Sequence, residues 1–430
     1  MDKVLLGKHF QIFETFVVSM MVMQDTDLFA LKRGLTESIY EQNDGELKPL
    51  RQAIALKKTT LQDPVVMDEE TQFIYDHLMQ GDSGEWLDTN NDYVRLLLLR
   101  IKQARQQANE ELQKQFTLLV INACSIFEIF IGDLLRFELS HVYQKQAYVA
   151  KRTLTFEQLL AAGSIDNMHA ELVESLIRDR QYASVTAWLE TYLEICTQTK
   201  VRHFKQIPVL QSYQEKIAQI FELRNIYVHN NGVATKKMVR LDSEAMVGEA
   251  VIISEDKVLW VIDTIFNLGI DLYLLNVKKD KQCQAAIYRD KLNRLLINYL
   301  RVQPQSVRQI YDYLVICAIK AGDYDECLID MFNIWLSYYF ANVIFEIEDY
   351  QEMIDVIDRN FPTDDAKFCL WQALISQSES QIVVGAINFL SAFRSDAERL
   401  NNINLPVFDI IKTNPVFSNY IRKLKYGVNE

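Results

Sequence analysis

Glycine and proline are both scarce in this 430-residue chain, which contains 13 glycines and 7 prolines. These two residues supply many of the backbone conformations that turns and helix breaks require. Their scarcity therefore predicts few loops and long helices. Since hydrophobic residues make up an ordinary 49% of the chain, we expect a mostly α fold with enough length for two or three domains.

Cysteine is sparse too, and the six cysteines form no C-x-x-C pair. Cys124, Cys317 and Cys369 lie in apolar helix-like runs, which is typical of reduced core residues. No signal peptide is visible, and the apolar run at 15–23 is too short to span a bilayer. These observations predict a cytoplasmic protein without a membrane partner.

Short motifs of several enzyme classes are missing. The chain has no P-loop, no G-x-G-x-x-G and no H-x-x-x-H pair, and no elbow motif supports Ser-His-Asp catalysis. Acidic residues gather at 323–326 and 364–365, but acidic groups at helix starts are more often caps than metal ligands. We therefore expect neither a metal nor an organic cofactor.

Positive charge is in deficit, because the net charge is −13. A general nucleic-acid coat is disfavoured, since phosphate contacts need Lys and Arg. A local basic cleft for a selective RNA substrate is still compatible with the composition. The candidate RNA-binding residues on either side of residues 224–229 are Lys200, Arg202, Lys205, Lys236, Lys237 and Arg240. Ordinary solvated surface charge is the alternative for each of them.

The segment from Arg224 to His229 is the most informative part of the chain. Upstream of it, Ile217, Ile220 and Phe221 repeat at helical spacing and, with Val228, predict one buried face, and Arg224 falls within that apolar stripe. The following Asn-Asn-Gly predicts the end of the helix, because Asn and Gly tolerate the left-handed conformation. We expect a fixed cation, an amide (Asn225) and an imidazole near one helix end.

This set of groups suits metal-independent RNA cleavage. An imidazole can take or give a proton while the 2'-OH of RNA attacks the adjacent phosphate, and an arginine can bind the phosphate oxygens and stabilise the transition state. In the structural alternative, His229 only caps the helix and Arg224 pairs with an internal carboxylate.

The residues 222–232, with the core R-N-x-x-V-H-N-N-G, resemble the signature of HEPN (higher eukaryote and prokaryote nucleotide-binding) domains. Residues 123–136 are similar to the central helix of that family. Residues 154–160 and 163–165 look like the connecting segment of its larger prokaryotic members, and 247–255 is similar to the lead into its final helix. The resemblance covers roughly residues 90 to 280, which is under half of the chain.

The resemblance implies an RNase of a toxin or antiviral system that acts as a dimer by pairing two motifs. Some members of the family are inactive scaffolds. Carried over to this chain, Arg224 and His229 become the catalytic pair and Asn225 an accessory residue.

Glu128 is a further candidate, because it lies in an apolar sector of the helix expected at 117–139. A buried carboxylate is costly unless it is paired. An ion pair between Glu128 and Arg224 would satisfy both groups and hold the arginine in place for catalysis. Another partner for Glu128, or solvent at a helix edge, is the alternative.

Three regions are predicted along the chain. Residues 1–90 form an N-terminal region of uncertain fold with turns at 43–45 and 81–84, and residues 91–280 form the HEPN-like helical domain. Residues 282–430 form a helical, aromatic-rich region in which 321–328 and 348–352 are similar to helical-hairpin starts. Such hairpins usually bind proteins, so a partner-sensing role is expected, and a plain helical bundle packed on the core is the alternative.

We therefore expect a mostly α protein with a HEPN-like core that acts as a metal-independent endoribonuclease of a bacterial toxin or antiphage (abortive infection) system. Its expected partners are an RNA substrate, a second copy of the chain, and an antitoxin or phage-derived protein trigger. Two alternatives remain: a catalytically inactive HEPN-like dimer that serves as an RNA- or protein-binding scaffold, and an all-helical adaptor in which the motif is only structural.

Overall fold

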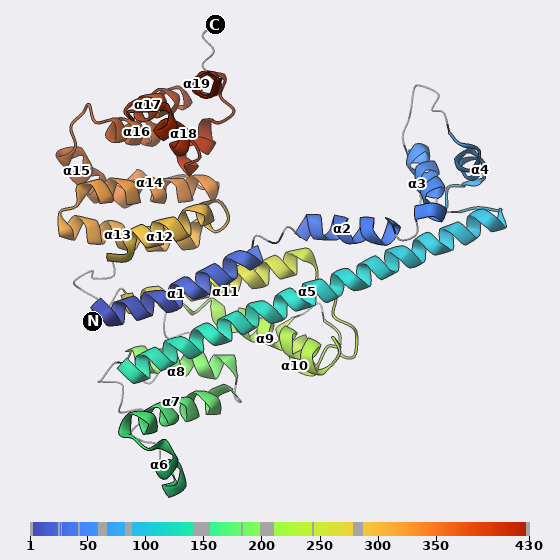
Figure 1. The fold of residues 1–430 in the computed structure, drawn as a ribbon, viewed down its shortest axis with the longest axis horizontal. Coiled ribbons are helices and arrows are strands. Elements are labelled where there is room, and N and C mark those ends of the chain that lie inside the picture. The colour runs from blue at the N-terminus through green and yellow to red at the C-terminus, as the bar shows by residue number, and fades with distance from the viewer. Residues whose placement is uncertain are drawn as a thin grey trace. The chain divides into compact units, whose positions relative to one another are not determined.

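The protein is described from a computed structural model, which is mostly helical as the composition predicts (Figure 1). The structure describes residues 3–24, 26, 28–41, 44–58, 67–81, 88–141, 155–181, 184–197, 210–242, 245–277 and 287–426. Within these ranges, β structure is limited to two isolated antiparallel bridges, Met79 with Asp88 and Val233 with Ala250.

The helices of the N-terminal and middle parts of the chain are α1 (Lys3–Gln24), α2 (Leu28–Glu41), α3 (Asp44–Lys58), α4 (Glu69–His77), α5 (Asp92–His141), α6 (Phe156–Ala162), α7 (Ile165–Gln181), α8 (Val185–Thr197), α9 (Tyr213–His229), α10 (Lys236–Leu241) and α11 (Glu255–Val277). Those of the C-terminal part are α12 (Arg289–Leu296), η5 (Ile297–Arg301), α13 (Pro304–Ala321), α14 (Tyr324–Phe340), η6 (Ile347–Tyr350), α15 (Gln351–Asn360), α16 (Ala366–Ile375), α17 (Glu379–Ser391), α18 (Asp396–Asn402), η7 (Pro406–Ile411) and α19 (Pro415–Tyr426).

The chain divides into two compact units. Unit 1 comprises Met1–Ser19, Ile126–Ile217 and Asp263–Glu430, and unit 2 comprises Met20–Ser125 and Ala218–Ile262. Four helices, α1, α5, α9 and α11, pass from one unit into the other. These boundaries differ from the three sequence regions predicted above, because a long helix shows no break in sequence at the point where its packing partners change.

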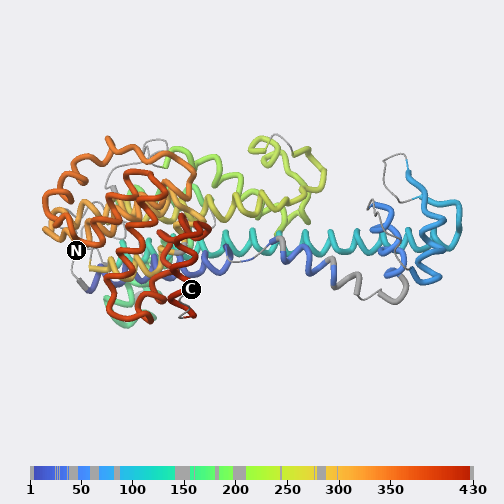
Figure 2. The backbone as a smooth tube through the Cα atoms, turned by 90° about the horizontal axis from the view of Figure 1, so that it is seen from above, coloured from blue at the N-terminus to red at the C-terminus, as the bar shows by residue number. Residues whose placement is uncertain are grey.

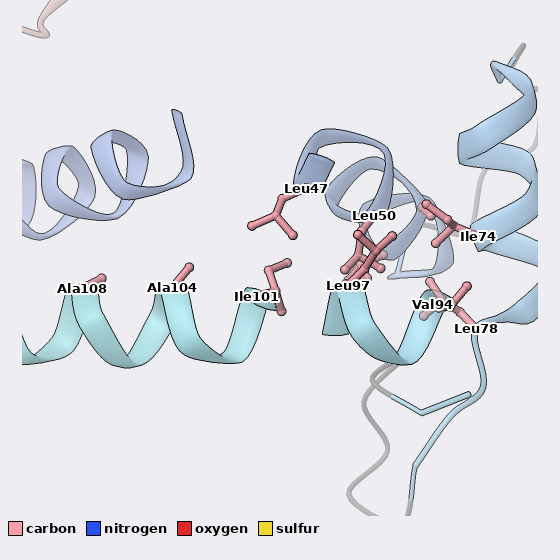
Figure 3. Close-up of a cluster of buried hydrophobic side chains, with 11 residues drawn as sticks. Leu47, Leu50, Ile74, Leu78, Val94, Leu97, Ile101, Ala104 and Ala108 are labelled. Atoms are coloured by element: carbon pink, nitrogen blue, oxygen red, sulfur yellow. The ribbon is translucent and has the colours of Figure 1, made fainter. Parts of the chain in front are cut away.

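In unit 2, α3 and α4 pack against the N-terminal end of α5, as Figures 1 and 2 show from two sides. Figure 3 shows the side chains that join them: Leu47 and Leu50 of α3 lie over Leu97 and Ile101 of α5, and Ile74 of α4 completes the cluster. All five are nearly inaccessible to solvent. The N-terminal region of uncertain fold is therefore mostly helical where it is described.

The two turns predicted in the N-terminal region have different outcomes. The turn predicted at 43–45 is wrong for Asp44 and Gly45, because α3 begins at Asp44. Asn43 lies outside the described residues, and so does most of the turn predicted at 81–84.

In unit 1, the second half of α5 lies in the core as expected, with Phe127, Ile131 and Leu134 fully buried. Phe16 of α1 stacks on Phe130 with ring centroids 4.2 Å apart. The predicted apolar central helix is thus confirmed as a core helix on one face, whereas Leu118 and Ile129 on it are 50% and 61% exposed.

The C-terminal part of unit 1 is built from helical hairpins. Helix α13 ends at Ala321 and is followed by the C-cap residue Gly322, whose φ of 71° is left-handed. The carboxylate of Asp323 then accepts from the amide of Glu326 to cap α14. Asp365 caps α16 through the amides of Lys367 and Phe368. The hairpin turn predicted at 321–328 is confirmed, and the acidic residues at 323 and 365 are helix caps.

The aromatic residues of this region are mostly internal. Trp371, Trp335 and Tyr338 are buried, whereas Tyr339 is 43% exposed. Burial of this kind is what packed hairpins require. The partner-sensing role of the region remains a prediction.

Two described helices, α5 and α11, contain stretches that are long and apolar enough to cross a membrane. Half of the α5 stretch and 72% of the α11 stretch are buried within the protein. Buried core helices of soluble proteins meet the same criterion of length and composition.

Candidate functional site

The candidate site lies at the C-terminal end of α9, in unit 2. The helix ends at His229. Two residues of the loop that follows, Asn231 and Gly232, have left-handed backbone conformations, with φ values of 51° and 77°. The amides of Asn230 and Gly232 both donate to the carbonyl of Ile226, at 2.8 and 3.0 Å. This arrangement satisfies the carbonyl of Ile226 at the helix end, so the predicted Asn-Gly stop is confirmed.

The burial of α9 differs from the predicted stripe over its last turns. Ile217, Ile220 and Phe221 are buried as expected, but Val228 is 43% exposed, so its assignment to the buried face is wrong. Leu223 and Ile226 take its place in the core. Because Leu223 and Ile226, and not Val228, form the buried face of these last turns, Arg224 does not lie at the centre of that face. Its side chain is half-buried.

Of the three polar residues of the motif, Arg224 and Asn225 are hydrogen-bonded, and Asn225 and His229 share a helix face. The Nη1 atom of Arg224 donates to Oδ1 of Asn225 at 3.1 Å. Asn225 and His229 are four residues apart and therefore share one face of the helix. Arg224 and His229 are five residues apart, which separates them by about 7.5 Å along the axis and about 140° around it. Asn225 thus lies between the cation and the imidazole, which is exposed.

The loop after α9 folds back onto the helix and is held at both ends. The amide of Val251 donates to the carbonyl of Gly232 at 2.9 Å, and the hydroxyl of Tyr227 donates to the carbonyl of Val251. The Gln113 side chain of α5 makes two hydrogen bonds of 2.9 Å with the backbone of Ile253. Burial raises the pKa of Tyr227, which keeps its hydroxyl protonated as a donor. These contacts fix the backbone around His229.

A buried carboxylate, Glu222, anchors α10 to α9. It is 6% exposed, and it accepts from Thr235 Oγ1 at 2.9 Å and from Lys237 Nζ at 2.7 Å. Thr235 is the N-cap of α10, with its hydroxyl accepting from the amide of Met238. A charge buried with two partners is strongly sensitive to the loss of either one. Glu222 is therefore a positioning residue that the sequence interpretation placed only on the flank of the motif.

Of the six candidate RNA-binding residues, three lie among the residues that the structure describes and three do not. Lys236 and Arg240 are exposed and four residues apart, so they share one face of α10. Lys237 lies beside them, but its ammonium group pairs with Glu222. Lys200, Arg202 and Lys205 lie outside the described residues.

Glu128 is half-buried on the part of α5 that belongs to unit 1, whereas Arg224 belongs to unit 2. The ion pair between them remains a prediction. The polar residues near Glu128 on the same helix have a structural role: Arg136 donates to Glu174 of α7 at 2.6 Å and to Asp133 at 2.9 Å.

Comparisons with protein-family models, curated proteins and solved structures find no match to this chain. The resemblance to HEPN domains therefore rests on the motif and its flanking segments alone.

The sequence interpretation did not anticipate two parts of the site. Gln113 and Tyr227 hold the loop: Tyr227 lies within the 224–229 segment, but neither residue was given a role there or on the preceding long helix. Glu222 offered a signal, because it is a carboxylate between the buried residues Phe221 and Leu223. A charge in that position needs a partner, and Thr235 and Lys237 are close in sequence.

Proposed function

We propose that this protein is a metal-independent endoribonuclease in which Arg224 and His229 act on the scissile phosphate and Asn225 positions them. One observation carries the proposal: at a capped helix end, an arginine is hydrogen-bonded to an asparagine that shares a helix face with an exposed histidine. The fixed loop after the helix supports it, because catalytic groups need a backbone held in place.

In the proposed reaction, the imidazole of His229 takes the proton from a ribose 2'-OH, and the oxygen forms a bond to the adjacent phosphorus. Arg224 binds the phosphate oxygens, where negative charge develops. The bond from phosphorus to the 5' oxygen breaks, that oxygen takes up a proton from water, and the imidazolium of His229 returns its proton to solvent. The products are a 2',3'-cyclic phosphate and a 5'-OH end.

Incubation of the purified protein with RNA in EDTA tests the reaction. We expect cleavage to products that end in 2',3'-cyclic phosphate, and loss of cleavage on His229→Ala by about 100-fold or more, which is the range for removal of a general acid–base group. His77→Ala is the matched control, because His77 is also an exposed residue that ends a helix, α4. Full cleavage by His229→Ala would refute the assignment.

A two-fold dimer would complete this site. One copy of the motif separates its cation and imidazole by about 140° around the helix, whereas a second copy would add an arginine and a histidine around the same cleft. Exposed apolar side chains lie on the same loop and helix end: Val228, Val233, Met246, Val247 and Ile252 are 37–76% exposed. A cluster of this kind on a folded surface is typical of an interaction site.

Charge insertion tests the dimer. Val247→Asp and Ile252→Asp should each shift the mass measured by light scattering towards the monomer and lower RNA cleavage in parallel. Val416→Asp on α19 is the control, since Val416 is 61% exposed but lies far away in sequence and in the other unit. A wild-type protein that is strictly monomeric and fully active would contradict the dimer.

The same apolar surface also favours the second candidate function, a non-catalytic dimer that binds RNA or protein as a scaffold. Absence of cleavage by the wild-type dimer would decide for it. Under the first function, expression of the protein should be toxic to bacteria, as a toxin or antiphage effector would be, and His229→Ala should relieve the toxicity.

A further inference from the structure

Two helical segments of unit 2 carry only positive charge. Residues 48–58 of α3 contain no acidic residue, and their basic residues are Lys48, Arg51, Lys57 and Lys58. Residues 95–105 of α5 also contain no Asp or Glu, and their basic residues are three arginines, the last of them Arg105, and one lysine. The net charge of the whole chain is −13, so two such segments are unusual in this protein.

The fold brings these two segments together. Their apolar faces meet in the core, where Leu47 and Leu50 lie over Ile101 (Figure 3). The adjoining surface encloses a hollow of about 610 Å³. It is lined by Lys48, Arg51, Gln52, Ile54, Ala55, Lys58, Ile101 and Arg105.

The chemistry of the hollow selects an anion. Its four cationic side chains, Lys48, Arg51, Lys58 and Arg105, are all exposed, and the described residues that line it include no carboxylate. Lysine and arginine donate hydrogen bonds and accept none, so the matching ligand carries several negatively charged acceptors. Buried Ile54 and Ile101 add an apolar floor. A positively charged groove that follows the phosphate backbone is one of the two features of single-stranded nucleic-acid sites, and the hollow supplies this one.

A polar stripe on α5 connects the hollow with the candidate site. Arg105, Asn109 and Gln113 recur at intervals of four residues, so they form one row that turns slowly around the helix. Gln113 holds the loop that follows His229, about 12 Å along the axis from Arg105. Helical geometry places Glu110 and Glu111 away from this row.

We infer that the hollow between α3 and α5 is an anchoring site for the phosphate backbone of single-stranded RNA, separate from the residues that cleave it. This inference rests on the proposed function, which identifies the anion as RNA. Attack by a 2'-OH needs a backbone that can bring this oxygen into line with the bond that breaks, which favours a single strand. The hollow then holds one part of the strand while another part lies at His229.

The test compares two triple variants that change the net charge equally. Lys48→Gln/Arg51→Gln/Lys58→Gln alters the hollow, and Arg422→Gln/Lys423→Gln/Lys425→Gln alters exposed residues of α19 as the matched control. Glutamine favours helices, so both variants should keep their fold, and circular dichroism checks this. Each is made in the His229→Ala background, and binding of a fluorescent 20-nucleotide single-stranded RNA is followed by anisotropy at several salt concentrations.

We expect the hollow variant to bind on the order of 10- to 100-fold more weakly near 0.1 M salt, with the slope of log K against log salt smaller by about 2. The control variant should bind as the parent does. In the background that retains His229, the hollow variant should raise the KM for the 20-nucleotide RNA more than for a 4-nucleotide RNA, which spans only about 14 Å when stacked.

The outcomes separate this inference from the proposed function. Equal binding by the hollow and control variants, or no RNA binding by the parent, would overturn the inference. RNA binding that depends on the hollow in a protein that never cleaves RNA would support the inference and overturn the nuclease.

Discussion

The substitution Gly232→Ala adds one methyl group and tests whether Tyr227 holds the loop that follows α9. Its φ is +77°, and a Cβ atom would lie 2.9 Å from Cε1 and 3.3 Å from Cδ1 of Tyr227. Favourable contacts between carbon atoms need about 3.5–4.0 Å. In Gly232→Ala the ring of Tyr227 must therefore move, and its hydroxyl then loses the hydrogen bond to Val251.

Two contributions set the expected cost. A left-handed conformation costs an alanine roughly 1–2 kcal/mol, and the lost hydrogen bond costs about 0.5–1.5 kcal/mol. Together they predict that the hydrogen bond between Val251 and Gly232 opens more readily by roughly 2–3 kcal/mol. Gly248→Ala is the matched control, because φ is +88° there and nothing lies within 4 Å of the added Cβ. It should show the backbone cost alone.

Hydrogen exchange of the Val251 amide, which donates to the carbonyl of Gly232 at 2.9 Å, measures this opening. We expect Gly232→Ala to speed its exchange by about 30- to 150-fold, with a smaller change in Gly248→Ala. RNA cleavage should fall with Gly232→Ala, since His229 lies three residues earlier in the chain. Equal exchange rates in the two variants would refute the role given to Tyr227.

Two further predictions concern ion pairs of unit 1. Arg289 Nη1 lies 2.8 Å from the fully buried Asp330, so Arg289→Met should destabilise the protein by about 3–5 kcal/mol in urea unfolding, and Arg289→Met/Asp330→Leu should recover most of this loss. Hydrogen bonds from Arg136 lower the pKa of Glu174 below its usual 4.5, so this pair stabilises the fold above that pH and its contribution is lost as the pH falls through the lowered value. Arg136→Ala should therefore weaken the dependence of the unfolding free energy on pH below about 4.5, and an unchanged dependence would contradict the pairing.

Features that depend on residues a few positions apart could be predicted from the sequence alone. Scarce Gly and Pro predicted the helical fold, Asn231-Gly232 the end of α9, and the acidic residues before α14 and α16 the caps that the structure shows. Helix formation and capping are decided by hydrogen bonds within about one turn, so the local sequence contains the necessary information.

Features that depend on which helices meet required the tertiary structure. The sequence placed Val228 on the buried face, but in the fold Leu223 and Ile226 face the core instead. Glu222 stood out as a carboxylate among apolar residues, but only the fold shows that it is buried and that Lys237 and Thr235 are its partners. Burial is decided by contacts between distant segments, and the hollow between α3 and α5 arises in the same way: each segment alone is an ordinary basic helix face, and only their packing gathers the four cations around one space.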